Sequence, residues 1–451
     1  MADINDIKYY PDRFYIRVNG CNMNGLFSPK DDFTLSLDQA VFIHEYYHYL
    51  TNITTFQGVR SFFAAFCDMM KIVVNLTNSG GLASFPIEKN TLPSCAYLTQ
   101  YWRDEKEIFK EDDIDKRLAE ETENAPSHRF EIKGIEKETG KPYSVVVDGK
   151  EIKGCREYLT IDIEGLQQTT NFHLSIGALD EFLSASIDEF IWENNLADNR
   201  QVFNKRYFYP YLTFDAILEY LGLNLGCRSK ILIAYYALHS KNPAVAFYDM
   251  LQQVKKDGYD AIEQNPAEYM EKHFSIFVGY DCLINEIDKF IEEAKAQKRV
   301  LTAHLLAYYQ DRFITATAFL KKDPLFFVCP FLIDNLNDER NRQDFWIGFI
   351  RIKTCFPEPL MIQGKDFITT RPSEYGADLT VLVLAIYEIM ESLEKNQVAK
   401  RLDHYKNKFD FPDGVENFED VSAFNDPPLT SYWHKALNEL GLYQFYRDNV
   451  K

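Results

Sequence analysis

Apolar residues recur at helical spacing through almost all of the chain after residue 173, and this periodicity constrains the fold more than any other feature. Helices of this kind bury their apolar faces against one another, so the sequence predicts a mainly α (α+β) protein with a large helical C-terminal body. Candidate helices cover residues 173–194, 212–223, 228–240, 243–256, 272–298, 300–321, 338–352, 377–396 and 431–447. We find no fixed-period repeat, which argues against a solenoid.

Two parts of the chain depart from the helical pattern. Residues 13–18 alternate as a β-strand does, and we expect them to begin a small sheet. Residues 143–147 favour a strand and precede Asp148-Gly149, a pair typical of the turn of a β-hairpin. We therefore divide the chain into residues 1–103, an inserted and partly β subdomain over residues 104–170, and a helical domain over residues 171–451.

Composition and charge restrict the class of protein. With 451 residues, of which 46% are apolar, the chain can bury a large core. Its net charge of −19 and the absence of a long basic run predict that it binds neither nucleic acid nor an anionic membrane. No apolar window reaches the roughly 20 residues that a membrane span requires, and residues 1–8 do not resemble a signal peptide. The eight cysteines are scattered singly along the chain and are expected to be reduced. Reduced thiols and the lack of a signal peptide both predict a cytoplasmic protein.

One helix in the N-terminal part carries the residues with chemical potential. Ser36 and Gln39 have the spacing of a capping box, which predicts that a helix begins at Leu37 and runs to about Thr51. Between residues 41 and 50 the only charged residue is Glu45, as expected for a helix that is buried. A single charged residue on a buried helix is typical of an active site, so the uncharged residues around Glu45 favour a catalytic role for it.

Residues 44–48 read H-E-Y-Y-H, an H-E-x-x-H pattern. Four residues apart on a helix, His44 and His48 project from one face and can converge on one ion. Neutral imidazole nitrogens are ligands that zinc prefers, and a catalytic zinc needs three protein ligands and an open position for water. Glu45 would take a proton from that water and later return it to the leaving amine.

The pattern and its uncharged flanks resemble the longer signature of the zincin metallopeptidases. Thr51 and Thr54 stand where the metzincin branch has Gly and His, which excludes that branch. Residues 176–184 resemble instead the helix by which thermolysin-like gluzincins supply a third, glutamate ligand, and the match puts Glu181 at that position. The resemblance thus implies a zincin-like catalytic core holding one Zn2+ per chain through His44, His48 and Glu181.

The match to the gluzincin helix has two departures. Asp180 replaces the usual Asn, and Ala185 stands where the family has an aspartate that orients a zinc-bound histidine. Asp188, about two turns after Glu181, is the candidate for that orienting role. Asp68, a lone carboxylate in an apolar stretch, is the alternative third ligand.

Other features of the expected site leave alternatives open. Glu181 shares one polar arc with Asp180, Ser184 and Asp188, and such an arc is equally consistent with a solvent-exposed face and with the lining of a cleft. The resemblance also implies a downstream His or Tyr that stabilises an oxyanion. Its candidates are Tyr235, Tyr236 and His239.

Three functions follow from these observations. The first is a zinc metalloendopeptidase that acts on a protein or peptide substrate, with a partner protein as a candidate regulator of its activity. The second is a non-catalytic, acidic, helical protein-interaction module in which any metal is structural. The third is metal-dependent hydrolysis of a non-peptide amide.

Overall fold

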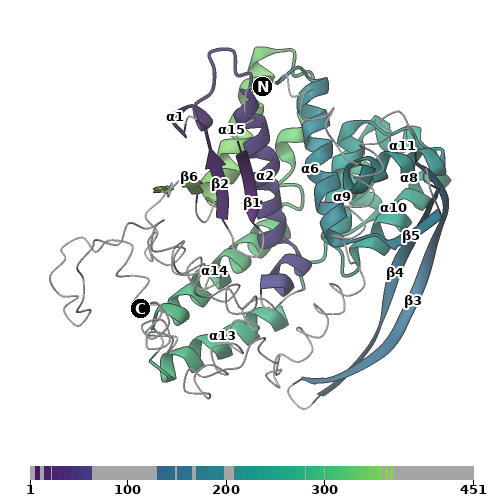
Figure 1. Cartoon of the computed structure of the whole chain (residues 1–451). Helices are drawn as coiled ribbons and strands as arrows, with labels where there is room; N and C mark the ends of the chain where they lie inside the picture. The colour runs from purple at the N-terminus through teal and green to yellow at the C-terminus, as the bar shows by residue number, and fades with distance from the viewer. Residues whose placement is uncertain are drawn as a thin grey trace, which may run out of the picture.

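The computed structural model of the 451-residue chain describes residues 6–10, 15–21, 23–62, 130–147, 150–164, 169–197, 208–279, 281–298, 300–357, 361–363 and 366–368. Within these residues the protein is mainly helical, with two small sheets (Figure 1). The strands are β1 Asp6–Tyr10, β2 Tyr15–Asn19, β3 Glu131–Val147, β4 Lys150–Glu164, β5 Thr169–His173, β6 Met361–Gln363 and β7 Asp366–Ile368. The α-helices are α1 Met23–Leu26, α2 Leu37–Thr54, α6 Ile176–Glu193, α8 Thr213–Leu221, α9 Cys227–Leu238, α10 Pro243–Asp257, α11 Tyr259–Gln264, α12 Pro266–His273, α13 Asp281–Ala296, α14 Val300–Lys322 and α15 Glu339–Cys355. A π-helix, η2 Phe208–Leu212, and a 3-10 helix, η3 Cys329–Leu332, complete the described elements.

The first sheet has the strand order β1-β2-β6-β7 and joins the two ends of the described chain. β1 and β2 are antiparallel, β2 and β6 are parallel, and β6 and β7 are antiparallel. Alternate residues of the first two strands are buried, namely Ile7, Tyr9, Ile16 and Val18. β1 is one of the two edge strands, and it lies beside α2 (Figure 1). The predicted small sheet near the N-terminus is therefore present, with partners from residues 361–368.

The second sheet is antiparallel, with the order β3-β4-β5. Figure 1 shows β3 and β4 as a long ribbon that extends away from the helices. Its base is anchored by buried Ile132, Ile135, Leu159 and Ile161. The pairing Val147↔Lys150 confirms the predicted hairpin. The boundaries proposed for the inserted subdomain stay a prediction.

Helices α2 and α6 lie side by side near the middle of the helical body (Figure 1). α2 is buried on several faces, and three of its tyrosine hydroxyls donate hydrogen bonds to backbone carbonyls far along the chain: Tyr46 to Phe356, Tyr47 to Phe327 and Tyr49 to Pro357. These bonds satisfy the phenols in an apolar environment, as buried tyrosines require. The uncharged flanks of the H-E-x-x-H pattern are thus the signature of a central helix.

Two of the predicted helices have different boundaries in the structure. The single helix expected over residues 272–298 is wrong, because α12 ends at His273 and α13 begins only at Asp281. Asn265 caps α12 through the Glu268 amide and Pro266 occupies its first turn, a start signal that the periodicity obscured. The helix expected from residue 173 begins at Ile176, because β5 ends at His173.

Other expectations depend on which residues the structure describes. The helices predicted over residues 377–396 and 431–447 lie outside them. Cys21, Cys227, Cys329 and Cys355 are free thiols, in agreement with the prediction for the cysteines. Among the described helices, none combines the length and the apolar character needed to span a bilayer.

Candidate metal centre

The capping box predicted from the sequence places α2. The Ser36 hydroxyl accepts from the Gln39 amide at 3.2 Å, and the Ser36 amide donates to the Gln39 side chain at 2.7 Å. Gln39 also donates to the carbonyls of Gly25 in α1 and of Ser28 in the loop that follows α1, which anchors the start of the helix to both. The helix then continues to Thr54, three residues beyond the predicted end. His44 and His48 therefore occupy consecutive turns of a firmly anchored helix.

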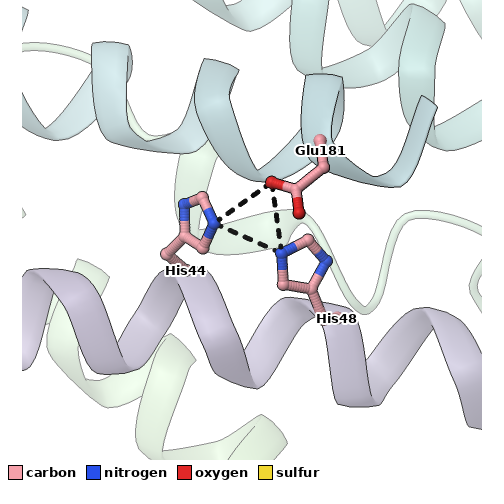
Figure 2. Close-up of side chains that lie close together, drawn as sticks. All are labelled: His44, His48 and Glu181. Carbon is pink, nitrogen blue, oxygen red and sulfur yellow. Dashed lines mark hydrogen bonds and ion pairs between the residues drawn. The ribbon is translucent and has the colours of Figure 1, made fainter. Parts of the chain in front are cut away.

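The structure brings His44, His48 and Glu181 together (Figure 2). The Nε2 atoms of the two histidines are 3.2 Å apart, and Glu181 Oε2 lies 3.6 Å from each of them. For comparison, a tetrahedral ion with bonds of about 2.0–2.1 Å separates its ligand atoms by roughly 3.3 Å. The three atoms thus form a triangle of nearly the size that one tetrahedral metal ion requires.

Glu181 Oε2 is buried and has no hydrogen-bond partner among the residues that the structure describes. A carboxylate oxygen removed from water without a partner is energetically costly, and native proteins pair such atoms with a donor, an ion or water. The site is not sealed, because the Glu181 side chain retains 29% of its exposure and those of His44 and His48 retain 13% and 10%. An ion bound here would satisfy Oε2 and keep a route to solvent.

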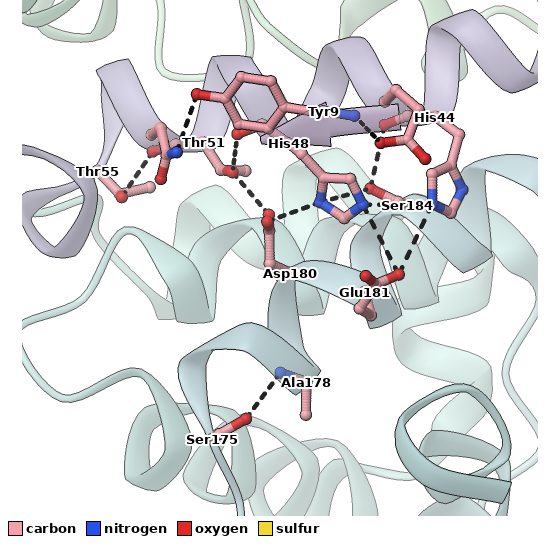
Figure 3. Close-up of polar contacts among 12 residues, drawn as sticks. Tyr9, His44, His48, Thr51, Thr55, Ser175, Ala178, Asp180, Glu181 and Ser184 are labelled. Atoms are coloured by element: carbon pink, nitrogen blue, oxygen red, sulfur yellow. Dashed lines mark hydrogen bonds and ion pairs between the residues drawn. The ribbon is translucent and has the colours of Figure 1, made fainter. Parts of the chain in front are cut away.

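Two aspartates of α6 contact the Nδ1 atoms of the histidines, on the opposite side of each ring from Nε2. Asp188 Oδ2 lies 2.9 Å from His44 Nδ1, and Asp180 Oδ2 lies 2.7 Å from His48 Nδ1. Thr51 donates to the other oxygen of Asp180 at 2.6 Å (Figure 3). A carboxylate at Nδ1 favours the tautomer with the proton on that nitrogen, which leaves the Nε2 lone pair for a metal.

The predicted contact between Asp188 and a histidine is therefore confirmed, whereas that of Asp180 was not predicted. The signal for it was available in the sequence: Asp180 directly precedes Glu181 and lies on the same polar arc. Ser184 and Asp188 on this arc are buried, with 0% and 3% exposure, so its interpretation as an ordinary solvent face is wrong. The arc faces α2.

The local sequence explains why α6 presents this arc. Ser175 caps the helix by accepting from the Ala178 amide at 2.9 Å, so α6 begins at Ile176. The apolar side of the helix, formed by Leu179, Leu183, Ile187 and Phe190, is completely buried. With that side fixed in the core, the helical period turns the carboxylates towards the histidines.

Glu45 points to β1, an edge strand of the first sheet. Its Oε2 accepts from the Tyr9 backbone amide at 2.6 Å, and the Tyr9 hydroxyl accepts from Asn52 at 3.0 Å. Burial raises the pKa of Glu45 above its ordinary range, and the nearby histidines and the Tyr9 amide only partly offset this effect. Glu45 is therefore directed towards β1 and not towards solvent.

The electrostatics of the cluster favour positive charge at its centre. Burial lowers the pKa of both imidazoles, but the adjacent carboxylates outweigh it, so that the pKa of His44 lies well above its usual range and that of His48 is raised to about 9. Burial raises the pKa of Glu181, but the two histidines and the Tyr211 hydroxyl lower it to about 2. The same carboxylates that stabilise bound protons would stabilise a cation.

The tyrosine beside this cluster is Tyr211, which was not among the candidates. It belongs to η2, which packs on α6, and its hydroxyl is close enough to the Glu181 carboxylate to lower the pKa of that group. The predicted candidates have other partners: Tyr235 donates to the Pro324 carbonyl, and His239 is fully buried with Nδ1 bonded to the Tyr235 carbonyl. No local pattern marks Tyr211, because it approaches Glu181 only through the packing of η2 on α6.

Asp68, the alternative third ligand, lies outside the described residues. The structure confirms a mainly helical protein with a buried His44, His48 and Glu181 group that can hold a metal ion, but not the zincin-like arrangement implied by the motifs. No protein-family model matches the chain, and no match is found among curated proteins or solved structures, so its assignment rests on this site.

Proposed function

We propose that the protein is a zinc metallopeptidase that binds one Zn2+ through His44 Nε2, His48 Nε2 and Glu181 Oε2. The observation that carries this proposal is the position of Glu181 Oε2, which is buried, makes no hydrogen bond to a described residue and lies within ion-pair distance, 3.6 Å, of both histidine Nε2 atoms. A donor set of two imidazoles and one carboxylate suits zinc and is typical of its catalytic sites. Structural zinc sites are closed by four protein ligands, whereas the described residues provide three here.

The chemistry divides between the ion and the chain. A bound zinc would act as a Lewis acid and lower the pKa of a water to about 7. Glu45 accepts the proton of the attacking water at its carboxylate and later donates it to the leaving nitrogen. Tyr9 holds Glu45 Oε2 in the folded structure, which fixes the direction of the carboxylate.

The peptide part of the proposal is supported by the position of Glu45 at a sheet edge. β1 ends its sheet, so one side of this strand makes no hydrogen bonds to another described strand. An extended peptide can add to such an edge through its backbone. The hydrogen bond from the Tyr9 amide to Glu45 Oε2 supports this arrangement, because it joins Glu45 to β1 itself. A substrate lying along β1 would thus present its amide bonds to Glu45.

The test compares Glu45→Gln with wild type and with a matched control, Glu271→Gln, which changes an exposed glutamate on α12. Zinc content is measured by elemental analysis, and cleavage is measured on an unstructured protein and a mixed peptide library. Wild type and control should carry one zinc and cleave. Glu45→Gln should keep the zinc but lose about 100-fold or more of the rate, as expected for removal of a general base.

Two results would contradict the proposal. Wild-type protein without stoichiometric zinc would remove the metal centre. Retention of zinc together with equal cleavage by Glu45→Gln would remove its catalytic role. If wild type binds zinc but cleaves neither substrate, while His44→Ala loses both zinc and thermal stability, a structural metal in an interaction protein becomes the better description.

A further inference from the structure

We infer that Tyr211 is a positioning residue for Glu181 and that an ion clamp of Asp215, Lys230 and Glu189 holds Tyr211 in place. This inference rests on the proposed function in one respect, namely that the site binds zinc. It assigns a metal-site role to a π-helix and to three charged residues that lie outside the metal triad.

The first step is the difference between Glu181 and the two histidines. Each histidine is fixed by an aspartate of α6 at its Nδ1 atom. Glu181 has no comparable partner on its own helix and is the most exposed of the three, with 29% of its side chain accessible. The hydroxyl of Tyr211 reaches its carboxylate. Tyr211 thus does for Glu181 what the aspartates do for the histidines, since outer hydrogen bonds orient metal ligands.

The second step is the geometry of the segment that carries Tyr211. η2 runs over Phe208–Leu212 and continues without interruption into α8, Thr213–Leu221. Pro210 lies inside η2 and cannot donate a backbone hydrogen bond, which disfavours regular α-helical pairing at this point. Single π-helical turns are frequent at functional sites because they redirect side chains. Here the turn packs on α6 and brings Tyr211 to Glu181.

The third step is the clamp on the same helical segment. Lys230 of α9 donates to Asp215 of α8 at 2.8 Å and to both oxygens of Glu189 of α6 at 2.9 and 3.1 Å. Its side chain is only 9% exposed, so it depends on these two carboxylates to compensate its buried charge. Asp215 follows Tyr211 by four residues, about one helical turn. Lys230 therefore ties the segment that carries Tyr211 to the helix that carries Glu181.

A double-mutant cycle tests whether the clamp acts through Tyr211. Zinc dissociation constants are measured by competition with a chelator for wild type, Tyr211→Phe, Asp215→Asn and the double variant. Tyr211→Phe should weaken zinc binding about 10- to 100-fold, the usual effect of removing an outer hydrogen bond. Asp215→Asn should weaken it about 3- to 10-fold. The double variant should bind like Tyr211→Phe alone, because the clamp then has nothing left to position.

Two controls separate positioning from folding. Asp249→Asn removes a carboxylate of the same kind from an exposed ion pair between α10 and β3, and it should leave the zinc dissociation constant unchanged. Asp215 is itself 59% exposed, so its replacement by Asn is expected to preserve the fold. Thermal unfolding of each variant in the presence of chelator measures any general loss of stability. If the clamp were merely structural, its removal would lower the stability but would not change zinc affinity in a non-additive way with Tyr211→Phe.

The possible outcomes bear on different parts of the inference. If wild type binds zinc and Tyr211→Phe binds it equally tightly, the role of Tyr211 is wrong while the proposed metal site stands. If the effects of Tyr211→Phe and Asp215→Asn multiply in the double variant, the clamp does not act through Tyr211. If wild type binds no zinc, the proposed function fails and this inference fails with it.

Discussion

At the scale of single residues, the two aspartates behind the histidines decide how the imidazoles present their nitrogens. Asp188 is 3% exposed and accepts from His44 Nδ1, so this buried carboxylate holds the ring in one orientation. Asp188→Asn should therefore keep the packing but weaken zinc binding by about 10-fold, and Asp188→Ala by up to about 100-fold. The check is chelator competition with each variant. Equal affinity in wild type and Asp188→Ala would show that His44 needs no orientation from α6.

At the scale of elements, α2 depends on the tight turn that follows it. A side chain at Gly58 would place its Cβ 2.2 Å from the Asn52 carbonyl oxygen, in contact with backbone that cannot move aside. Gly58→Ala should lower the free energy of unfolding by about 3 kcal/mol, the upper part of the range for overpacking. Gly222→Ala is the matched control, because Gly222 caps α8 at φ +69 with open space around it and should lose only about 1 kcal/mol. Urea unfolding with chelator present measures both, and equal losses would show that the approach to Asn52 is not limiting.

At the scale of the whole molecule, the core contains an ionisable group that the proposed chemistry does not use. His239 is fully buried at the end of α9, and burial lowers its pKa from about 6.5 to about 4. Between these values the unfolded chain binds a proton that the folded protein does not, so the free energy of unfolding falls as the pH falls. Above pH 6.5 His239 is neutral in both states and does not lower the free energy of unfolding. Below pH 4 it is protonated in both states, so its destabilising effect no longer grows.

This difference predicts the behaviour of one variant. Wild type should lose about 2 kcal/mol more than His239→Gln between pH 7.5 and pH 5, because Gln can keep a donor for the Tyr235 carbonyl without titrating. Chemical unfolding at the two pH values gives the measurement. The same pH dependence in both proteins would assign the acid sensitivity to other groups.

Much of the fold and the site follows from local sequence. The spacing of Ser36 and Gln39 determined where α2 begins, the uncharged flanks of Glu45 determined that this helix is buried, and the positions of His44 and His48 placed both rings on one face. The helical periodicity located most of the later helices, and Asp148-Gly149 located the hairpin. These features are encoded within one or two helical turns or a single β-turn, where the backbone itself fixes the relations among residues.

The convergence of α2 and α6 was decided only by tertiary structure. The match to Glu181 placed a carboxylate in an arc, but only packing showed that this arc faces the histidines rather than solvent. Tyr9 reaches Glu45 across 36 residues, and Tyr211 reaches Glu181 through a π-helix. Such contacts depend on which apolar faces bury each other, and no short pattern contains that information. The sequence by itself therefore determined the chemical groups on each helix, and the tertiary structure decided which of those groups meet.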